Sequence, residues 1–248
     1  NGIVGSATTS VGNRLGDPNG AYRTSGAGNG RLTWGGTASD FMFKGRSTLT
    51  LSTWIRPLDA SYSRQVFMEY GNGVFALEVM PNGGTTTHFY VNEGFGQTFS
   101  FDTQKWNHIV MILDGAKKKL YKNGQLIAET DFTGTVNQHA SAFKIGGRGN
   151  ANDNVKADWD DVRIYDRALG MDEVGHLYDL EKPPPPSITK QPTNTTSVIG
   201  STATFDVNAT GATSYQWQTQ DANGTWSNLA GANSATLTLA NVQNDNNG

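Results

Sequence analysis

Apolar and polar residues alternate in short runs along most of this chain, a pattern typical of β-strands buried on one face. Such runs, bounded by Gly, Asn, Asp or Pro, predict strands at Leu49–Arg56, Gln65–Tyr70, Val74–Val79, Lys118–Lys122, Gln125–Glu129, Ala142–Gly146 and Trp159–Tyr165. The run Trp106–Leu113 is apolar almost throughout, which predicts a strand covered on both faces. Strands at this spacing predict an antiparallel sandwich.

Turn residues join some of these strands into hairpins. Asn123-Gly124 supplies both positive-φ positions of a type I′ turn, and the glycines of Gly71-Asn72-Gly73 predict a second hairpin. The segment Met171–Leu180 is the one convincing helix in the pattern. Its apolar residues recur at helical spacing, so one face is expected to pack against the sheet: Val174, Leu177 and Tyr178.

The run Pro183–Pro186 marks a domain boundary, because consecutive prolines form a stiff spacer and join neither a helix nor a sheet interior. We therefore expect a first domain at 1–182, a linker at 183–187 and a second domain at 188–248. Alternating runs predict further strands in the second domain, at Ala203–Val207, Tyr215–Gln218 and Ala235–Leu239.

Composition and charge do not indicate nucleic-acid binding. The chain of 248 residues has a net charge of −3, and its longest basic run, Lys117–Lys119, is interpreted as a solvated hairpin.

No run approaches the roughly 18 apolar residues of a membrane-spanning helix, so membrane insertion is not expected. The lack of Cys fits a bacterial exported protein or a cytosolic one. Because the chain starts at Asn1 without an apolar leader, we interpret it as a processed or excised piece.

Several segments of the first domain resemble a known family, both in their residues and in their order along the chain. They are LTLSTWIRP at Leu49–Pro57, KWNHIVMILDG at Lys105–Gly115, KLYKNGQLIAE at Lys119–Glu129 and DDVRIYDRALGMDEVGHLY at Asp160–Tyr178. On these segments, residues 1–182 resemble a laminin-G-like jelly roll of the concanavalin A-like lectin/glucanase superfamily. The resemblance implies an all-β antiparallel jelly-roll sandwich with one short C-terminal helix. It also implies that an N-terminal edge strand of the family is missing before Asn1.

The second domain resembles a bacterial immunoglobulin-like domain. The matching segments are PSITKQP at Pro186–Pro192, GSTATFDVNATGATSYQWQ at Gly200–Gln218 and GANSATLTLANV at Gly231–Val242. The resemblance makes Trp217 the core tryptophan, and Val207 stands where many such domains have a Cys. It also implies that the C-terminal strands of this β-sandwich are missing, so the whole chain resembles an internal piece of a modular surface or secreted protein.

The sequence favours a protein that is not an enzyme. Glucanases on this fold place their carboxylates in an E-x-D-x-x-E string, which this chain lacks. The nearest candidates are Glu69 and Glu78, which the expected hairpin register places on opposite faces of the sheet, where they cannot flank one glycosidic bond. His108 is interpreted as a core histidine bonded to the backbone rather than a ligand or base.

Asp160 is the carboxylate whose predicted position best suits the binding of a metal ion. It shares the parity of Val162 and Ile164, so it is expected to point toward the core at the rim of the sandwich, where a buried carboxylate needs a partner. A structural Ca²⁺ is one such partner, and the family resemblance implies the same. A salt bridge to Arg163 or Arg167, or capping of loop amides, is the alternative.

Sugar sites use partly exposed aromatic rings with polar side chains beside them. The candidate ligand-binding residues lie in predicted loops or near them: Tyr62, His88, Phe95, Arg148, Asn150, Asn152 and Asp153. Each alone is more often a solvated loop residue.

We interpret the chain as a non-catalytic carbohydrate-binding or adhesion module of a secreted or cell-surface bacterial protein. Its expected partner is a polysaccharide or glycosylated surface, with other copies of itself as a further partner through open sheet edges. One alternative is a purely structural module of a filament, array or adhesin. A second is an accessory region of a glycoside hydrolase or lyase.

Overall fold

The computed structural model describes residues 3–4, 8–26, 30–34, 43–59, 65–71, 73–80, 86–92, 96–98, 100–139, 142–148 and 153–244. The chain is divided into two compact units, Asn1–Lys182 and Pro183–Gly248. The division falls directly before the four prolines at 183–186. Each unit is described by itself below.

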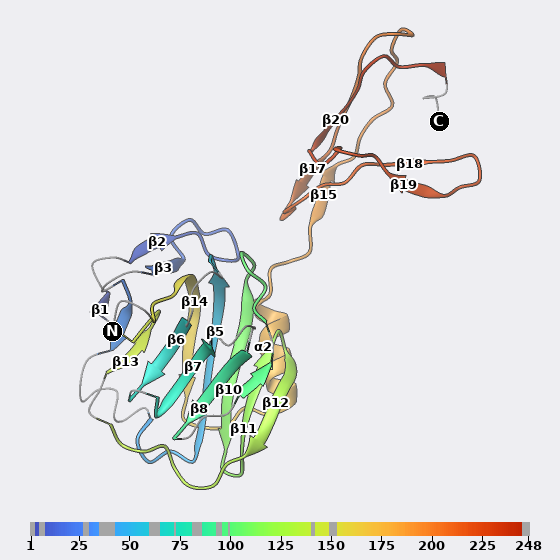
Figure 1. Cartoon of the computed structure of the whole chain (residues 1–248). Helices are drawn as coiled ribbons and strands as arrows, with labels where there is room; N and C mark the ends of the chain where they lie inside the picture. Colours follow the sequence, from blue (N-terminus) through green and yellow to red (C-terminus); the bar gives the residue numbers. More distant parts are fainter. Residues whose placement is uncertain are drawn as a thin grey trace. The chain divides into compact units, whose positions relative to one another are not determined.

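Unit 1 is a sandwich of two antiparallel sheets, each with seven described strands (Figure 1). The first, called the β6 sheet, runs in the order β1 (Ile3–Val4), β4 (Leu32–Trp34), β13 (Phe143–Ile145), β6 (Gln65–Tyr70), β7 (Phe75–Met80), β8 (Thr86–Val91) and β9 (Gly96–Thr98). The second, called the β5 sheet, runs in the order β12 (Gln125–Asp131), β11 (Lys117–Lys122), β10 (Asn107–Asp114), β5 (Thr48–Pro57), β14 (Lys156–Tyr165), β3 (Ala21–Ser25) and β2 (Thr9–Val11).

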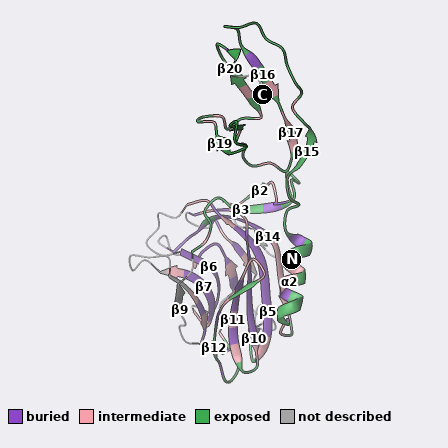
Figure 2. Ribbon diagram, turned by 90° about the vertical axis from the view of Figure 1, so that its right-hand side faces the viewer, coloured by how far each residue is buried: buried purple, intermediate pink, exposed green. Residues whose placement is uncertain are grey.

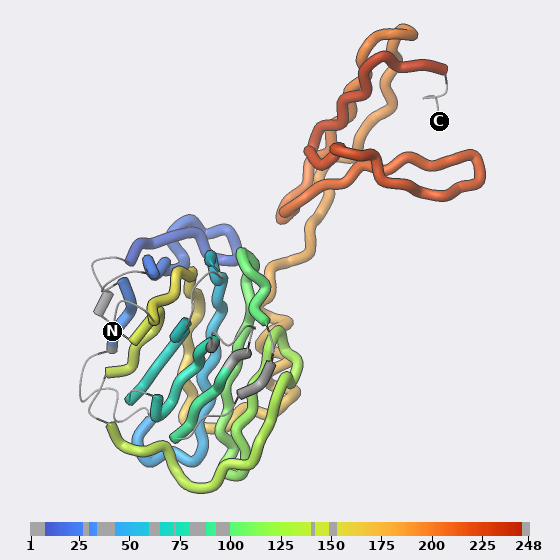
Figure 3. The backbone as a smooth tube through the Cα atoms, viewed as in Figure 1, coloured from blue at the N-terminus to red at the C-terminus, as the bar shows by residue number. Residues whose placement is uncertain are grey.

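The chain passes repeatedly from one sheet to the other, as the tube in Figure 3 allows the reader to follow. It leaves β5, builds β6 to β9 in the opposite sheet, and returns for β10 to β12. It then crosses again for β13 and returns for β14, which lies between β5 and β3. This arrangement confirms the predicted all-β antiparallel jelly roll.

Each sheet turns one apolar face toward the other, and those faces form the main core (Figure 2). Strand β10 is buried from Asn107 to Leu113, as its continuous apolar run predicted. Ile109, Met111 and Leu113 belong to the core between the sheets, whereas Val110 and Ile112 face the other way. Burial on both faces of β10 therefore requires a cover on its outer side.

That cover is the helix α2 (Met171–Glu181), which lies on the side of the β5 sheet facing away from the β6 sheet (Figure 2). Its Val174 is fully buried and packs in a second apolar cluster with Val110 and Ile112. The Glu173 carboxylate accepts a hydrogen bond from the Gly170 N–H at the helix start, 2.8 Å away. The predicted helix is confirmed, with one more residue at its C-terminus.

The turn chemistry is confirmed where the structure describes it. Asn123 and Gly124, which join β11 to β12, have φ angles of 51° and 77°, as a type I′ turn requires. A side chain at Gly124 would also approach Tyr178 of α2, since a Cβ there would lie 3.2 Å from that ring. The turn residues therefore allow the hairpin to pass under the helix.

Two β-bulges, which the sequence pattern did not reveal, change the parity of β6 and β14. The register of β6 against β7 shifts between Val66 and Met68, so that Phe67 and Met68 both belong to the core. The register of β14 against β5 shifts between Asp160 and Arg163, and Asp161 there has a φ of 47°. Beyond each bulge, the residues that face outward are those that strict alternation would have placed inward.

The described residues of unit 2 form three separate two-stranded ladders. These are β15 (Ser187–Lys190) with β17 (Asn208–Thr210), β16 (Ala203–Asp206) with β20 (Thr236–Leu239), and β18 (Gln218–Gln220) with β19 (Trp226–Asn228). Trp217 precedes β18, so the strand predicted at Tyr215–Gln218 is wrong in its position. Only Ala203 and Val242 are buried hydrophobic residues in the described part of this unit. The immunoglobulin-like assignment stays a prediction.

Truncation of the helix anchor tests how far unit 1 depends on α2. Val174→Ala removes buried methyl groups and leaves a cavity, so we expect the free energy of unfolding of unit 1 to fall by ~2 kcal/mol. The control is Leu180→Ala on the same helix, since Leu180 is 70% exposed and its truncation should cost less than ~0.5 kcal/mol. Urea unfolding followed by tryptophan fluorescence measures both, and equal losses would contradict the packing role of Val174.

Candidate functional site

The outer face of the β6 sheet carries a cluster of charged and aromatic side chains. Cross-strand pairing aligns Lys144 with Glu69, Glu69 with Ala76, and Ala76 with Tyr90. In the neighbouring row, Glu78 pairs with His88. Residues in cross-strand register share a face, so these side chains point to the same side of the sheet. We call Glu69, Glu78, His88, Tyr90, Lys144 and Arg148 the β6-face cluster.

Arg148 joins the two glutamates of this cluster. Its Nε donates to the Oε2 atom of Glu69, and its Nη2 lies 3.4 Å from the Oε2 atom of Glu78. Glu69 is 1% exposed and Glu78 is fully buried, so both carboxylates need the countercharge that Arg148 provides. Lys144 adds a second cation, with its Nζ 3.6 Å from Glu69 Oε1 and 2.9 Å from the backbone oxygen of Arg148.

The prediction that Glu69 and Glu78 point to opposite faces is therefore wrong. The predicted register opposed Glu69 to Phe75, whereas the bulge at Phe67 opposes it to Ala76, which shares its face with Glu78. The expectation of no catalysis stays a prediction, and the contacts of the Arg148 guanidinium with both carboxylates favour it.

The aromatic part of the cluster is the pair of rings on β8. His88 and Tyr90 are half-buried, and their rings stack with centroids 5.5 Å apart and an interplanar angle of 16°. Because the two rings face each other, the surface left for the apolar face of a sugar is the outer face of this stacked pair. The nearby cations Arg148 and Lys144 supply donors for hydroxyl groups.

Of the ligand-binding residues predicted from sequence, His88 and Arg148 lie together in this cluster. Asp153 is 7% exposed, and its backbone oxygen accepts a hydrogen bond from the Val66 N–H at 3.1 Å. The others fall outside the described residues: Tyr62, Phe95, Asn150 and Asn152. Sequence reasoning missed Lys144 and Tyr90 as members, although the alternation of Tyr90 with Phe89 pointed to an outward-facing ring.

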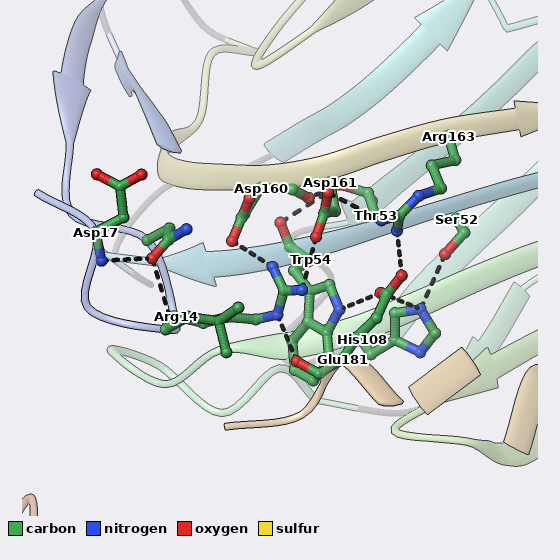
Figure 4. Close-up of polar contacts among 12 residues, drawn as sticks. Arg14, Asp17, Ser52, Thr53, Trp54, His108, Asp160, Asp161, Arg163 and Glu181 are labelled. Atoms are coloured by element: carbon green, nitrogen blue, oxygen red, sulfur yellow. Dashed lines mark hydrogen bonds and ion pairs between the residues drawn. The ribbon is translucent and has the colours of Figure 1, made fainter. Parts of the chain in front are cut away.

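Asp160 lies in a different polar network, on the outer face of the β5 sheet (Figure 4). The bulge at Asp161 overturns the parity argument, because Val162 and Ile164 pack against the core while Asp160 pairs with Trp54 on the outer side. Burial raises the pKa of the Asp160 carboxyl, and the positive charge of Arg14 opposes part of this rise.

Arg14 is the centre of this network. Its guanidinium donates to Asp160 Oδ2 and, at 2.6 Å, to Asp161 Oδ2, and its Nε donates to the backbone oxygen of Glu181 at 2.7 Å. It also lies 4.9 Å from the centroid of the Trp54 ring. The N-terminal segment of unit 1 is thereby tied to β14 and to the end of α2.

The described neighbours of Asp160 do not fit the Ca²⁺ ion that was expected there, because a guanidinium already lies against the carboxylate. No group of three or more potential metal-ligating side chains occurs within the described ranges. The predicted alternative partners also bond elsewhere: Arg163 pairs with Asp161 and Glu181, and Arg167 with Glu173. Structural calcium stays an untested expectation, and the geometry favours Arg14 in its place.

His108 is a core histidine, as predicted, although its partner is a side chain. It is fully buried, its Nε2 lies 2.9 Å from Ser52 Oγ, and its ring packs beside those of Trp54 and Tyr178, which also stack on each other. Burial lowers the pKa of His108 to about 4, with further lowering by Arg14 and Arg163. The imidazole is therefore neutral at neutral pH.

A family model described as the concanavalin A-like lectin/glucanases superfamily, of the laminin G type, matches residues 19–175. The match covers more than half of the chain. The chain therefore belongs to this superfamily. A search of curated proteins found no match to the sequence. In the described part of the chain, no helix has the length and apolarity needed to cross a membrane.

Solved structures with a similar fold include binding domains. The binding domain of Paraclostridial mosquitocidal protein 1 has a TM-score of 0.57 at 20% identity, over 73% of this chain and 47% of that one. Domain 4 of an extracellular arabinanase from Geobacillus stearothermophilus, in complex with arabinotriose, has a TM-score of 0.51 at 18% identity, over 69% and 87%. The ligand binding domain of botulinum neurotoxin serotype D, in complex with N-acetylneuraminic acid, has a TM-score of 0.55 at 13% identity, over 73% and 46%. The chain thus spans about half the length of the two toxin domains, and the likenesses show the jelly-roll fold.

Chelation and an arginine substitution together test what neutralises Asp160. We expect EDTA to leave the melting temperature of unit 1 unchanged, and Arg14→Gln to lower the free energy of unfolding by about 3 kcal/mol or more, because it leaves a buried carboxylate unpaired. The matched control is Arg167→Gln. The Arg167 side chain is 56% exposed, so its ion pair with Glu173 should contribute less than ~1 kcal/mol. If Ca²⁺ raised the melting temperature and Asp160→Ala abolished that rise, a bound Ca²⁺ at Asp160 would be established instead.

The lowered pKa of His108 makes unit 1 sensitive to acid. His108 takes up a proton near pH ~6.5 in the unfolded chain and near pH 4 in the folded one. The stability that the neutral, buried imidazole contributes is therefore complete above pH ~6.5, and it is lost as the pH falls from ~6.5 to about 4. We expect a loss of about 3 kcal/mol between pH ~7 and pH ~4 that is absent from His108→Gln. His176→Gln, at an exposed position on α2, is the control, and urea titrations at both pH values measure the difference.

Proposed function

We propose that unit 1 is a carbohydrate-binding module whose ligand binds at the β6-face cluster. The observation that carries the proposal is the stacked pair His88 and Tyr90 beside the fixed donors of Arg148 and Lys144 on the same face of the sheet. A pyranose or furanose ring lies against these aromatic rings, and its hydroxyl groups bond to the exposed edges of Arg148 and Lys144.

Two further points support binding without catalysis. Arg148 holds Glu69 and Glu78 together, so the pair orients cations toward the ligand rather than acting on a bond. The similar structures of low identity include an arabinanase domain in complex with arabinotriose and a toxin domain in complex with N-acetylneuraminic acid. We further propose that the module acts outside a bacterial cell, on polysaccharide or a glycosylated surface.

A glycan array with the full chain and its variants tests this function. We expect Tyr90→Ala to weaken binding to neutral oligosaccharides by roughly tenfold or more, because stacking of a sugar ring on Tyr contributes about 1–2 kcal/mol beyond bulk contacts. The matched control is Tyr22→Ala, a 45% exposed tyrosine on the β5 sheet, which should bind as the unaltered chain does.

Two results of the array and one result of a separate hydrolysis assay would contradict the proposal. The first is no binding to any glycan, and the second is equal loss in both tyrosine variants. The third is release of reducing sugar from a polysaccharide that Glu69→Gln or Glu78→Gln abolishes, which would restore catalysis as the function of the cluster.

For unit 2 we propose a separate function, which is association with other copies of the chain through its sheet edges. The three ladders have two strands each, so each described strand has an edge that no described strand covers. Apolar side chains are exposed in the same unit: Ile188, Val198, Ile199 and Trp226. Added strands from another copy would complete these ladders by β-augmentation.

Sedimentation velocity over a range of concentrations tests self-association. We expect the full chain to form dimers or larger species, and Ile188→Asp in β15 to shift it toward the monomer, because a charged edge opposes strand addition. The control is Leu15→Asp in unit 1, where the replaced residue is 58% exposed against 53% for Ile188. If the chain were a monomer at all concentrations, the proposal of self-association through these edges would be wrong.

A further inference from the structure

A row of charged residues crosses the outer face of the β5 sheet away from the apolar cluster under α2. Asp158 of β14 pairs in register with Arg23 of β3 on one side and Arg56 of β5 on the other. Their neighbours Trp159 and Ile55 belong to the core between the sheets, so the row faces outward. Trp106, directly before β10, continues the row beside Arg56.

Asp158 fixes both guanidinium groups. Its carboxylate is fully buried and accepts hydrogen bonds from Arg23 Nε at 2.6 Å and Nη2 at 3.0 Å, and from Arg56 Nε at 2.9 Å and Nη2 at 2.6 Å. The two arginine side chains are 37% and 28% exposed. Within the described part of the chain, neither Nη1 atom has a hydrogen-bond partner, so the outer edges of both groups keep donors for a ligand.

The row carries an excess of positive charge. Lys156 lies two residues before Asp158 on the same face of β14, is exposed, and has no ion pair among the described residues. Three cations therefore lie around Asp158, while Asp160, the next carboxylate on this face of β14, is already paired with Arg14, in a chain whose net charge is −3. General attraction of an anion to the whole chain is unfavourable, so an anion that binds here must respond to the local charge.

The aromatic member favours a sugar as the carrier of that anion. Trp106 is half-buried, and the Arg56 guanidinium lies 5.0 Å from its ring centroid. A fixed guanidinium edge binds a carboxylate or sulfate group through parallel hydrogen bonds, and an indole beside it offers apolar contact to the ring that carries the group.

We propose that Arg23, Arg56 and Lys156, with Trp106, form a second binding site that takes an acidic polysaccharide through its carboxylate or sulfate groups. This site is on the opposite sheet from the β6-face cluster and does not depend on it. Asp158 acts as the positioning residue, which holds the two guanidinium groups in place before the ligand arrives.

Binding of soluble polymers to the full chain tests the site, measured by biolayer interferometry at low and high salt. Polygalacturonate presents carboxylates, dextran sulfate presents sulfate esters, and dextran is the neutral reference. We expect binding to at least one acidic polymer, loss of that binding at high salt, and no effect of Tyr90→Ala on it. The polymer that binds more tightly identifies the anionic group.

Two variants at the site and one matched control decide the assignment. Lys156→Glu changes an exposed residue, and the double variant Arg56→Gln with Asp158→Asn removes one cation together with the buried carboxylate charge that it shares with Arg23. Each should weaken binding about tenfold or more, since hydrogen bonds to charged groups are the stronger class. Lys190→Glu in unit 2 makes the same change in net charge at an exposed lysine and should have less than about a twofold effect.

The proposal is overturned if neither acidic polymer binds, if Lys156→Glu binds as tightly as the unaltered chain, or if Lys190→Glu weakens binding equally. Lys156→Glu keeps the test valid if the double variant does not fold. Loss of neutral-glycan binding in Tyr90→Ala with retained acidic-polymer binding separates this site from the β6-face cluster, so either proposal can fail alone.

Discussion

The two-residue period of a β-strand is the constraint on which both outer faces of unit 1 depend. A strand in this sandwich must give its apolar residues to the core, so its polar residues go to the outside. In β6, the bulge lets Phe67 and Met68 both reach the core and then sends Glu69 outward. In β14, alternation from Trp159 already places Asp160 outward, and the extra residue at Asp161 then returns Val162 to the core side. The bulge in β6 is therefore the reason that Glu69 lies on an outer face, and the bulge in β14 is the reason that Val162 and Asp160 do not share a face.

Arginines then make those buried carboxylates tolerable. Removing a carboxylate from water costs several kcal/mol unless a countercharge and hydrogen bonds replace the water. Arg148, from the loop after β13, provides this for Glu69 and Glu78, and Arg14 does so for Asp160 from near the start of the unit. The partners are far apart in sequence, so each pair forms only when the sandwich has closed. The ion pairs consequently favour the correct arrangement of segments more than they add to its net stability.

The sequence predicted those features of the fold that depend on local pattern. Strand β6 has the predicted bounds, β10 is buried on both faces, and the Asn123-Gly124 turn has its positive φ angles. The parity of Glu69 and Asp160 was not predictable in this way, because a bulge adds one residue without a distinct residue type to mark it. The pairing of Asp160 with Arg14 depends on contacts between residues 146 positions apart, which no local pattern contains. The candidate site was found only in part for the same reason: His88 and Arg148 stood out singly, and the bulge joined them to the glutamates.

The same physical arrangement recurs on both faces, and it bears on the binding proposed for each of them. A buried carboxylate holds a guanidinium at a fixed angle, which removes much of the entropy loss that an arginine would suffer on meeting a ligand. On the β6 face two carboxylates hold one guanidinium, and on the β5 face Asp158 holds two. A catalytic pair needs its carboxylates directed at the substrate, whereas these carboxylates are directed at arginines. The acidic residues therefore organise the cations, and at the two proposed sites a ligand would meet the exposed edges of the cations and the aromatic rings beside them.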